Sequence, residues 1–192
     1  MRQIDLFSAP AGGQLEAELA LDDQALQSWR LRVLAYQQPL RRGTPASAGQ
    51  QANLFEAESE NFHIPPDPLT LPAQHLQFWR WPEALNQGAA LFYVFDHGLG
   101  PDRELLLYLG ETSQADRRWK GDHDCKDYLA AYGEALVRCR LLPRFSIRFW
   151  CDAPTKTRAR RQLEQQQIRH WQPPFNKECR QRWQTPFQNQ PH

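Results

Sequence analysis

Five polar side chains in the second half of the chain have the types that hydrolysis of a phosphodiester bond requires. They are Tyr93, Tyr108, Arg118, Glu164 and Asn176. The reaction needs a deprotonated water, charge neutralisation on the phosphoryl oxygens and help for the leaving oxygen. Tyrosine can exchange a proton when assisted, arginine can hold a phosphate, and glutamate can hold a divalent cation. The set is therefore compatible with phosphodiester cleavage.

A strip of cations lies among these positions. Between residues 138 and 161 the basic residues are Arg138, Arg140, Arg144, Arg148, Lys156, Arg158, Arg160 and Arg161, and the only acidic residue is Asp152. The whole chain has a net charge of only +1, because residues 1–88 hold 6 Lys/Arg against 10 Asp/Glu. The remaining residues hold 17 basic and 12 acidic side chains. Such a local patch can follow a phosphate backbone, although a solvated helix face has the same composition.

The elements that must position the five side chains alternate between strand and helix patterns. Strands are predicted where apolar, aromatic and β-branched residues run together or alternate with polar ones, and helices where apolar residues recur at helical spacing. In chain order the strands are 90–96 and 105–110, the helices 113–120 and 126–141, then a strand at 144–150 and a helix at 155–171. This order predicts a small α+β domain in which helices flank a three-stranded antiparallel sheet.

The triplets at the two strands resemble a known family. The first strand carries Leu91-Phe92-Tyr93, and the second carries Tyr108-Leu109-Gly110. With the arginine, glutamate and asparagine that follow in order on the expected elements, residues 89 to about 180 resemble the GIY-YIG nuclease family. The first triplet has neither Gly nor Ile, and the 14-residue loop between the tyrosines is long. We take Tyr93 as the first motif tyrosine, which places Phe92 and Val94 on the opposite face of the strand.

The resemblance implies a role for each member of the set. Glu164 would be the protein ligand of one Mg²⁺ or Mn²⁺, with water and phosphate in the other positions. Arg118 would hold the scissile phosphate. Tyr93 or Tyr108 would accept the proton of the attacking water, and the sequence does not decide between them. Asn176 would position the phosphate or the Glu164 carboxylate.

Further residues near this set are candidates for the site or for DNA contact. Arg117 competes with Arg118, although the spacing from Tyr108 favours Arg118. His123 is an additional site candidate, because some family members use a histidine near there. The predicted DNA-binding residues are Arg117, Lys120, Arg144, Arg148, Arg158 and Arg161. Taken singly, Tyr93 and Tyr108 could be ordinary strand aromatics, and Arg118 and Glu164 could be surface charges on helices.

Residues 1–88 are interpreted as a partly flexible arm containing a helix at about 22–38, and residues 181–192 as a tail. Segments 1–20 and 39–52 read as loose because they contain proline and glycine. Two pentapeptides, Gln3-Ile4-Asp5-Leu6-Phe7 and Gln51-Ala52-Asn53-Leu54-Phe55, resemble peptides that bind the bacterial sliding clamp. Their predicted contact residues are Gln3, Leu6, Phe7, Gln51, Leu54 and Phe55. The alternative is that both Leu-Phe pairs pack on the nuclease-like domain.

The resulting hypothesis is a metal-dependent DNA endonuclease of DNA repair or recombination. A restriction-type nuclease that reads a short sequence, and a non-catalytic nucleic-acid-binding adaptor on the same fold, remain alternatives, and RNA remains a possible substrate. The four cysteines form no Cys-x-x-Cys pair, and the N-terminus lacks the apolar core of a secretory signal. No apolar run approaches the ~20 residues of a membrane helix. We therefore expect a cytoplasmic protein that does not enter a membrane.

Overall fold

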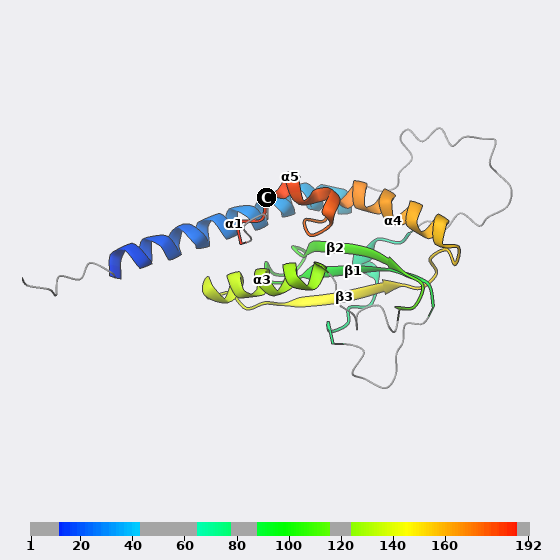
Figure 1. Cartoon of the computed structure of the whole chain (residues 1–192), viewed down its shortest axis with the longest axis horizontal. Helices are drawn as coiled ribbons and strands as arrows, with labels where there is room; N and C mark the ends of the chain where they lie inside the picture. The colour runs from blue at the N-terminus through cyan, green and yellow to red at the C-terminus, as the bar shows by residue number, and fades with distance from the viewer. Residues whose placement is uncertain (1–11, 43–64, 78–87, 116–123, 188–192) are drawn as a thin grey trace, which may run out of the picture.

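The computed structural model describes residues 12–42, 65–77, 88–115 and 124–187 (Figure 1). It has the predicted α+β architecture with a three-stranded antiparallel sheet. The helices and strands are α1 (Gly12–Arg42), β1 (Ala90–Asp96), β2 (Leu105–Thr112), α3 (Asp124–Arg138), β3 (Phe145–Trp150), α4 (Thr157–Trp171) and α5 (Arg180–Trp183). Two short 3₁₀ helices, η1 (Pro68–Thr70) and η3 (Lys177–Cys179), complete the described elements.

β1 is the central strand of the sheet, whose order is β2-β1-β3. Every residue of β1 is buried, as expected for an apolar run that is covered on both faces. Phe92 pairs with Gly110, Tyr93 with Leu109 and Val94 with Tyr108, and a bulge follows Val94. A Cβ atom at Gly110 would lie 2.6 Å from Cζ of Phe92. The glycine of the second triplet is therefore required by the close approach of the Phe92 ring.

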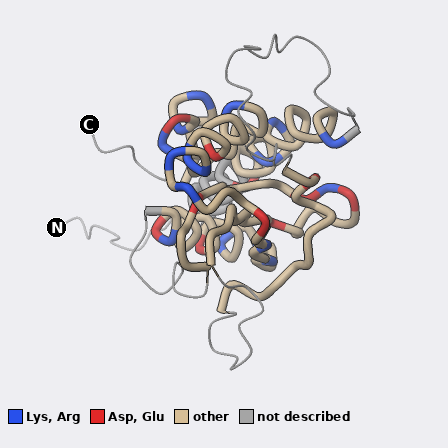
Figure 2. Tube along the Cα trace, turned by 90° about the vertical axis from the view of Figure 1, so that its right-hand side faces the viewer, with Lys and Arg blue, Asp and Glu red and all other residues tan. Residues whose placement is uncertain are grey.

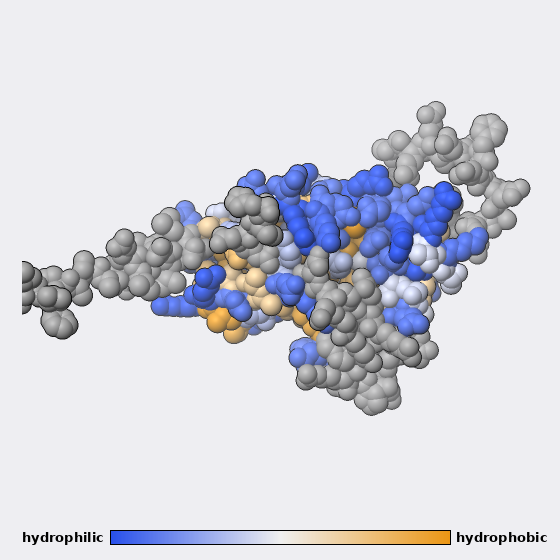
Figure 3. Space-filling view, viewed as in Figure 1, coloured by the Kyte–Doolittle hydropathy of each residue, from blue (hydrophilic) through white to orange (hydrophobic). Residues whose placement is uncertain are grey.

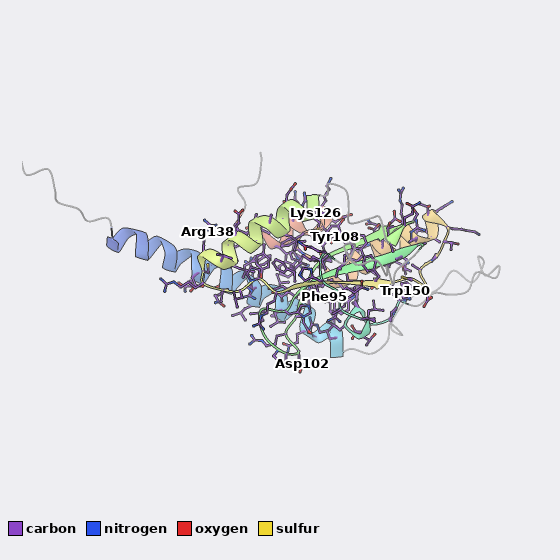
Figure 4. The ribbon with its side chains drawn as sticks, turned by 90° about the horizontal axis from the view of Figure 1, so that it is seen from below. Phe95, Asp102, Tyr108, Lys126, Arg138 and Trp150 are labelled. Carbon is purple, nitrogen blue, oxygen red and sulfur yellow. The ribbon has the colours of Figure 1, made fainter. Side chains whose placement is uncertain are left out.

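Helices cover one face and one edge of the sheet. Tyr132 of α3 packs against Phe145 of β3, with 5.8 Å between ring centroids, so α3 covers one face. The η1 segment lies on the other face, where Arg148 donates hydrogen bonds to the carbonyls of Pro68 and Leu69. Figure 4 shows α3 and η1 on the two sides of the sheet. Helices α1 and α4 run along the outer edge of β2 (Figure 1).

Helix α1 is longer than the predicted helix at 22–38. Leu26, Trp29 and Val33 are buried at the predicted spacing. The interpretation of 12–20 and 39–42 as loose is wrong, since both segments are helical. Residues 14–20 are strong helix formers that outweigh the two glycines before them. Pro39 is tolerated close to the end of the helix, where Arg41 bonds to Glu104 and holds the last turn.

A buried polar cluster joins α1, β1 and α3. Asp96 is fully buried, and its Oδ2 accepts hydrogen bonds from Nη2 of Arg30 at 3.0 Å and from the Tyr132 hydroxyl at 2.7 Å. Its Oδ1 accepts from the backbone N–H of Gly98 at 2.7 Å. Burial, reinforced by the Asp96 charge, raises the pKa of Tyr132, so its hydroxyl stays a proton donor. The cluster ties α1 to the sheet.

The described part of the predicted tail also packs on the core. Trp183 is buried, and its Nε1 donates to the carbonyl of Gln172 at 2.7 Å. Phe187 contacts Trp29 edge to face, with 5.4 Å between ring centroids. The chain from residue 181 to residue 187 therefore closes over α1. Within the described ranges no helix is both long and apolar enough to span a bilayer.

Candidate functional site

Two of the predicted site residues bind the backbone of β2 next to a third. The side chain of Asn176 binds both backbone groups of Leu109: its Oδ1 accepts from the N–H at 3.0 Å, and its Nδ2 donates to the carbonyl at 2.8 Å. Oε1 of Glu164 accepts from the backbone N–H of Glu111 at 3.0 Å. Tyr108 is the neighbour of Leu109 in the same strand. Asn176 and Glu164 thus bind the backbone of β2 one and three positions after Tyr108.

The edge of β2 explains why these side chains have to be polar. An edge strand exposes unpaired N–H and C=O groups that need partners. Gln37 of α1 bonds both the N–H and the carbonyl of Leu106 at 2.9 Å, and Phe175 donates its backbone N–H to Leu107 at 3.0 Å. Asn176 and Glu164 bind the backbone groups of Leu109 and Glu111, which lie further along the same edge. Among the described residues, the edge is therefore bound by side chains of α1 and α4 and by the segment between α4 and η3.

Replacing Asn176 with alanine is expected to lower the free energy of unfolding by about 2–4 kcal/mol, because it removes two hydrogen bonds and leaves the Leu109 backbone unpaired. Asn176→Asp should cost a similar amount, since a carboxylate oxygen would then face the Leu109 carbonyl. Urea unfolding monitored by tryptophan fluorescence measures both. Gln162→Ala, on the exposed face of α4, is the matched control and should change stability by less than about 0.5 kcal/mol. Equal effects at the two positions would contradict this account of Asn176.

Tyr93 does not join Tyr108. Successive residues of a strand point to opposite faces, and Tyr93 pairs with Leu109 while Val94 pairs with Tyr108. Tyr93 therefore lies on the face of the sheet opposite to Tyr108, and it is Phe92 that contacts the Tyr108 ring, at 5.8 Å between centroids. The choice of Tyr93 over Phe92 as the first motif position is not supported by this register.

The environment of Tyr93 is also unsuitable for proton transfer. The side chain is fully buried, and its hydroxyl has no hydrogen-bond partner among the described residues. Burial raises the pKa of Tyr93 far above its usual value, which disfavours the phenolate that a base requires. Tyr108 is half-buried and is the better placed of the two tyrosines.

The role of Glu111, which binds two arginines beside Glu164, was not predicted from the sequence, although Arg161 was predicted to bind DNA. Glu111 binds two arginines of α4: its Oε2 accepts from Nε of Arg160 at 2.7 Å, and its Oε1 accepts from Nε of Arg161 at 3.3 Å. Arg160 is buried, and it also donates to the carbonyls of Pro154 and Thr155. The available signal was the position of Glu111, directly after the Tyr-x-Gly triplet.

The predicted DNA-binding residues differ in their exposure to solvent. The prediction that Arg148 contacts DNA is not supported by its position. Its side chain is only 6% exposed, its guanidinium lies 4.8 Å from the Phe95 ring centroid, and it donates to a carbonyl of η1. Arg144, Arg158 and Arg161 are exposed. Figures 2 and 3 show many cations and a hydrophilic surface over the helical side of the molecule.

Several predictions fall outside the described residues. These are the site candidates Arg118 and His123, the DNA-binding candidates Arg117 and Lys120, and the six residues of the clamp-like peptides, Gln3, Leu6, Phe7, Gln51, Leu54 and Phe55. They stay predictions.

A divalent cation fits one part of this arrangement. In the part of the chain that the structure describes, no three His, Cys, Asp or Glu side chains gather as a metal site. A cation held by a single carboxylate needs no such group, because Mg²⁺ keeps several water ligands. Glu164 is half-buried, and the Glu111 N–H fixes the position of one of its oxygens. Its hard oxygen ligand suits Mg²⁺ or Mn²⁺.

A second polar cluster lies at the other end of β2. Nε2 of His97 is 2.5 Å from the Ser146 hydroxyl, and its Nδ1 is 3.7 Å from Oε1 of Glu104. Burial lowers the pKa of His97, and the charge of Arg148 acts in the same direction, against Glu104. The cluster links β1, β3 and the start of β2, and it shares no residue with the group around Glu164.

Comparison with known proteins adds no family to this picture. No family model matches the sequence, and neither the curated proteins nor the solved structures give a match. The likeness to GIY-YIG nucleases therefore rests on the residues and their arrangement alone.

Proposed function

We propose that the protein is a metal-dependent endonuclease that hydrolyses phosphodiester bonds of DNA, in DNA repair or recombination. One observation carries the proposal: Glu164 and Asn176, which are far from Tyr108 in the sequence, bind the backbone of β2 at residues 111 and 109, next to Tyr108. The order of these residue types resembles the GIY-YIG family, and their convergence is what a shared site requires. The exposed cations on α4 are compatible with a polyanionic substrate.

The side chains would divide the work as follows. Glu164 would hold Mg²⁺ or Mn²⁺, which when bound stabilises charge on phosphoryl oxygens and lowers the pKa of a ligand water. Tyr108 would accept or relay the proton of the attacking water, because Tyr93 lies on the other face of the sheet. Asn176 would act through the backbone, since both ends of its amide hold Leu109 and thereby keep Tyr108 in place. We assign the phosphate-holding role to Arg118, as the family resemblance implies.

The proposal is tested by cleavage of labelled linear, nicked, flap and four-way DNA with Mg²⁺, Mn²⁺ or EDTA. Glu164→Gln keeps an oxygen that can accept from the Glu111 N–H but removes the charge, so it should fold normally and cut at least about 100-fold more slowly. Glu178→Gln removes a carboxylate from an exposed position and should cut like the wild-type protein. Preference for one branched or nicked substrate supports a repair enzyme, whereas fixed cuts in linear duplex indicate a restriction-type enzyme.

Two results would overturn the proposal. One is the absence of metal-dependent cleavage on every substrate while DNA is still bound, which would favour a non-catalytic adaptor. The other is unchanged cleavage by Glu164→Gln, because activity would then have to come from another site.

A further inference from the structure

A chain of charged side chains leads from the core to the surface next to Glu164. Arg160 is 1% exposed, and its guanidinium is fixed by the carbonyls of Pro154 and Thr155 at 3.0 and 2.9 Å. The same guanidinium donates to Oε2 of Glu111 at 2.7 Å. Oε1 of Glu111 then accepts from Nε of Arg161 at 3.3 Å. Because both of its oxygens are engaged, the Glu111 carboxylate is held in one orientation.

Arg161 is the exposed end of this chain. Its side chain is 68% exposed even though its Nε is bound to Glu111. The Nη groups have no hydrogen-bond partner among the described residues, so they are available to an external ligand. A guanidinium held by Nε presents its other N–H groups in a planar fork that matches two phosphate oxygens.

Arg161 and Glu164 are neighbours on the same helix face. They are three residues apart on α4, a spacing that places their side chains side by side. Both also bind Glu111, Arg161 through its carboxylate and Glu164 through its backbone N–H. The exposed guanidinium therefore lies beside the carboxylate that would hold the metal.

Among the described residues, the formal charges of this group sum to zero before a ligand binds. Glu111 and Glu164 contribute two negative charges, and Arg160 and Arg161 contribute two positive ones. A divalent cation on Glu164 would leave the group with an excess positive charge that a phosphodiester anion could neutralise.

We propose that Arg161 binds a phosphate group of the nucleic acid beside Glu164, and that Glu111 and Arg160 are positioning residues that hold it there. This inference rests on the proposed function, and it adds a phosphate-binding residue that the family resemblance did not assign to the site. In this proposal the Glu111–Arg160 ion pair has a role besides packing, because the pair fixes the orientation of the exposed Arg161 side chain.

The test is equilibrium binding of a short labelled DNA duplex to the full-length protein in Ca²⁺, which supplies a divalent cation, with the duplex checked for cleavage after each measurement. Arg161→Ala should weaken binding by roughly tenfold, because a charge-assisted contact to phosphate is lost. Arg169→Ala removes the same charge from an exposed position in the last turn of α4 and should stay within about twofold. Arg161→Lys keeps the charge but lacks the planar fork, so it should recover only a small part of the loss.

Glu111→Gln gives the sharpest contrast. Simple electrostatics predicts tighter DNA binding when a negative charge is removed. A positioning role predicts weaker binding, because the amide no longer pairs with both arginines. Thermal unfolding shows whether the Glu111→Gln protein is folded. If it is not folded, the Arg161 variants alone test whether Arg161 binds phosphate.

The outcomes separate this inference from the proposed function. If Arg161→Ala and Arg169→Ala bind DNA equally well, Arg161 is an ordinary surface cation and the inference is overturned, whether or not the protein cleaves. If Arg161→Ala loses binding selectively but the wild-type protein cleaves no substrate, the phosphate site stands and the nuclease function fails. If the wild-type protein binds no DNA, both are overturned.

Discussion

Replacing Arg30 with methionine is expected to lower the free energy of unfolding by about 3–5 kcal/mol, the usual cost of leaving one member of a buried ion pair without its partner. Asp96 is fully buried and Arg30 is 2% exposed, so water cannot replace the lost guanidinium. Methionine has a similar length and keeps most of the apolar contacts of the side chain. The loss measured by urea unfolding therefore reports the charge.

A control and a rescue variant sharpen this prediction. Arg32→Met removes an exposed arginine of the same helix that donates to the carbonyl of Trp183, and it should cost less than about 1 kcal/mol. Adding Asp96→Asn to Arg30→Met removes the unpaired charge. The amide oxygen can still accept from the Gly98 N–H, and the amide NH2 can donate to the Tyr132 hydroxyl, so the change should restore part of the stability. A loss below about 1 kcal/mol for Arg30→Met alone would mean that α1 is held by its apolar side chains only.

The elements of the sheet could be predicted because their residues are locally consistent. The strand predicted at 90–96 is the strand that the structure contains, since an unbroken aromatic and β-branched run favours no other element. The helix before Pro173 ends at Trp171, as predicted from the two prolines that follow it. The C-terminal end of α1 could not be predicted, because its last turn is held by the contact between Arg41 and Glu104, 63 residues apart in the chain. Its N-terminal extension could have been predicted from the helix propensity of residues 14–20.

The site was only partly predictable for a related reason. Glu164 and Asn176 could be chosen by type and order, but their contacts with the β2 backbone depend on how α4 and the segment after it pack on the sheet. The face of Tyr93 could not be read from β1, because both faces of that strand are buried and the apolar pattern is the same in either register. Hydrophobic alternation specifies a face only where one face meets water.

Substituting phenylalanine for each motif tyrosine in turn is expected to separate their roles. Tyr108→Phe should lower the cleavage rate by about 10²–10⁴-fold, the range for loss of a proton-transfer group. Tyr93→Phe should leave the rate within a factor of about three, because the Tyr93 side chain lies on the opposite face and is fully buried. Initial rates on the preferred DNA substrate at saturating Mg²⁺ measure both, under conditions where Glu164→Gln serves as the inactive reference.

Stability gives an independent readout for the same two variants. The Tyr93 hydroxyl is buried without a partner among the described residues, so removing it should leave the protein as stable as before or more stable by about 1 kcal/mol. An inactive Tyr93→Phe protein of unchanged stability would contradict the assignment of Tyr108 as the proton-transfer residue. It would require the reacting groups to lie on the η1 side of the sheet, away from Glu164 and Asn176. Active Tyr93→Phe together with inactive Tyr108→Phe places the chemistry at the β2 edge, where the glutamate and the asparagine already bind the strand.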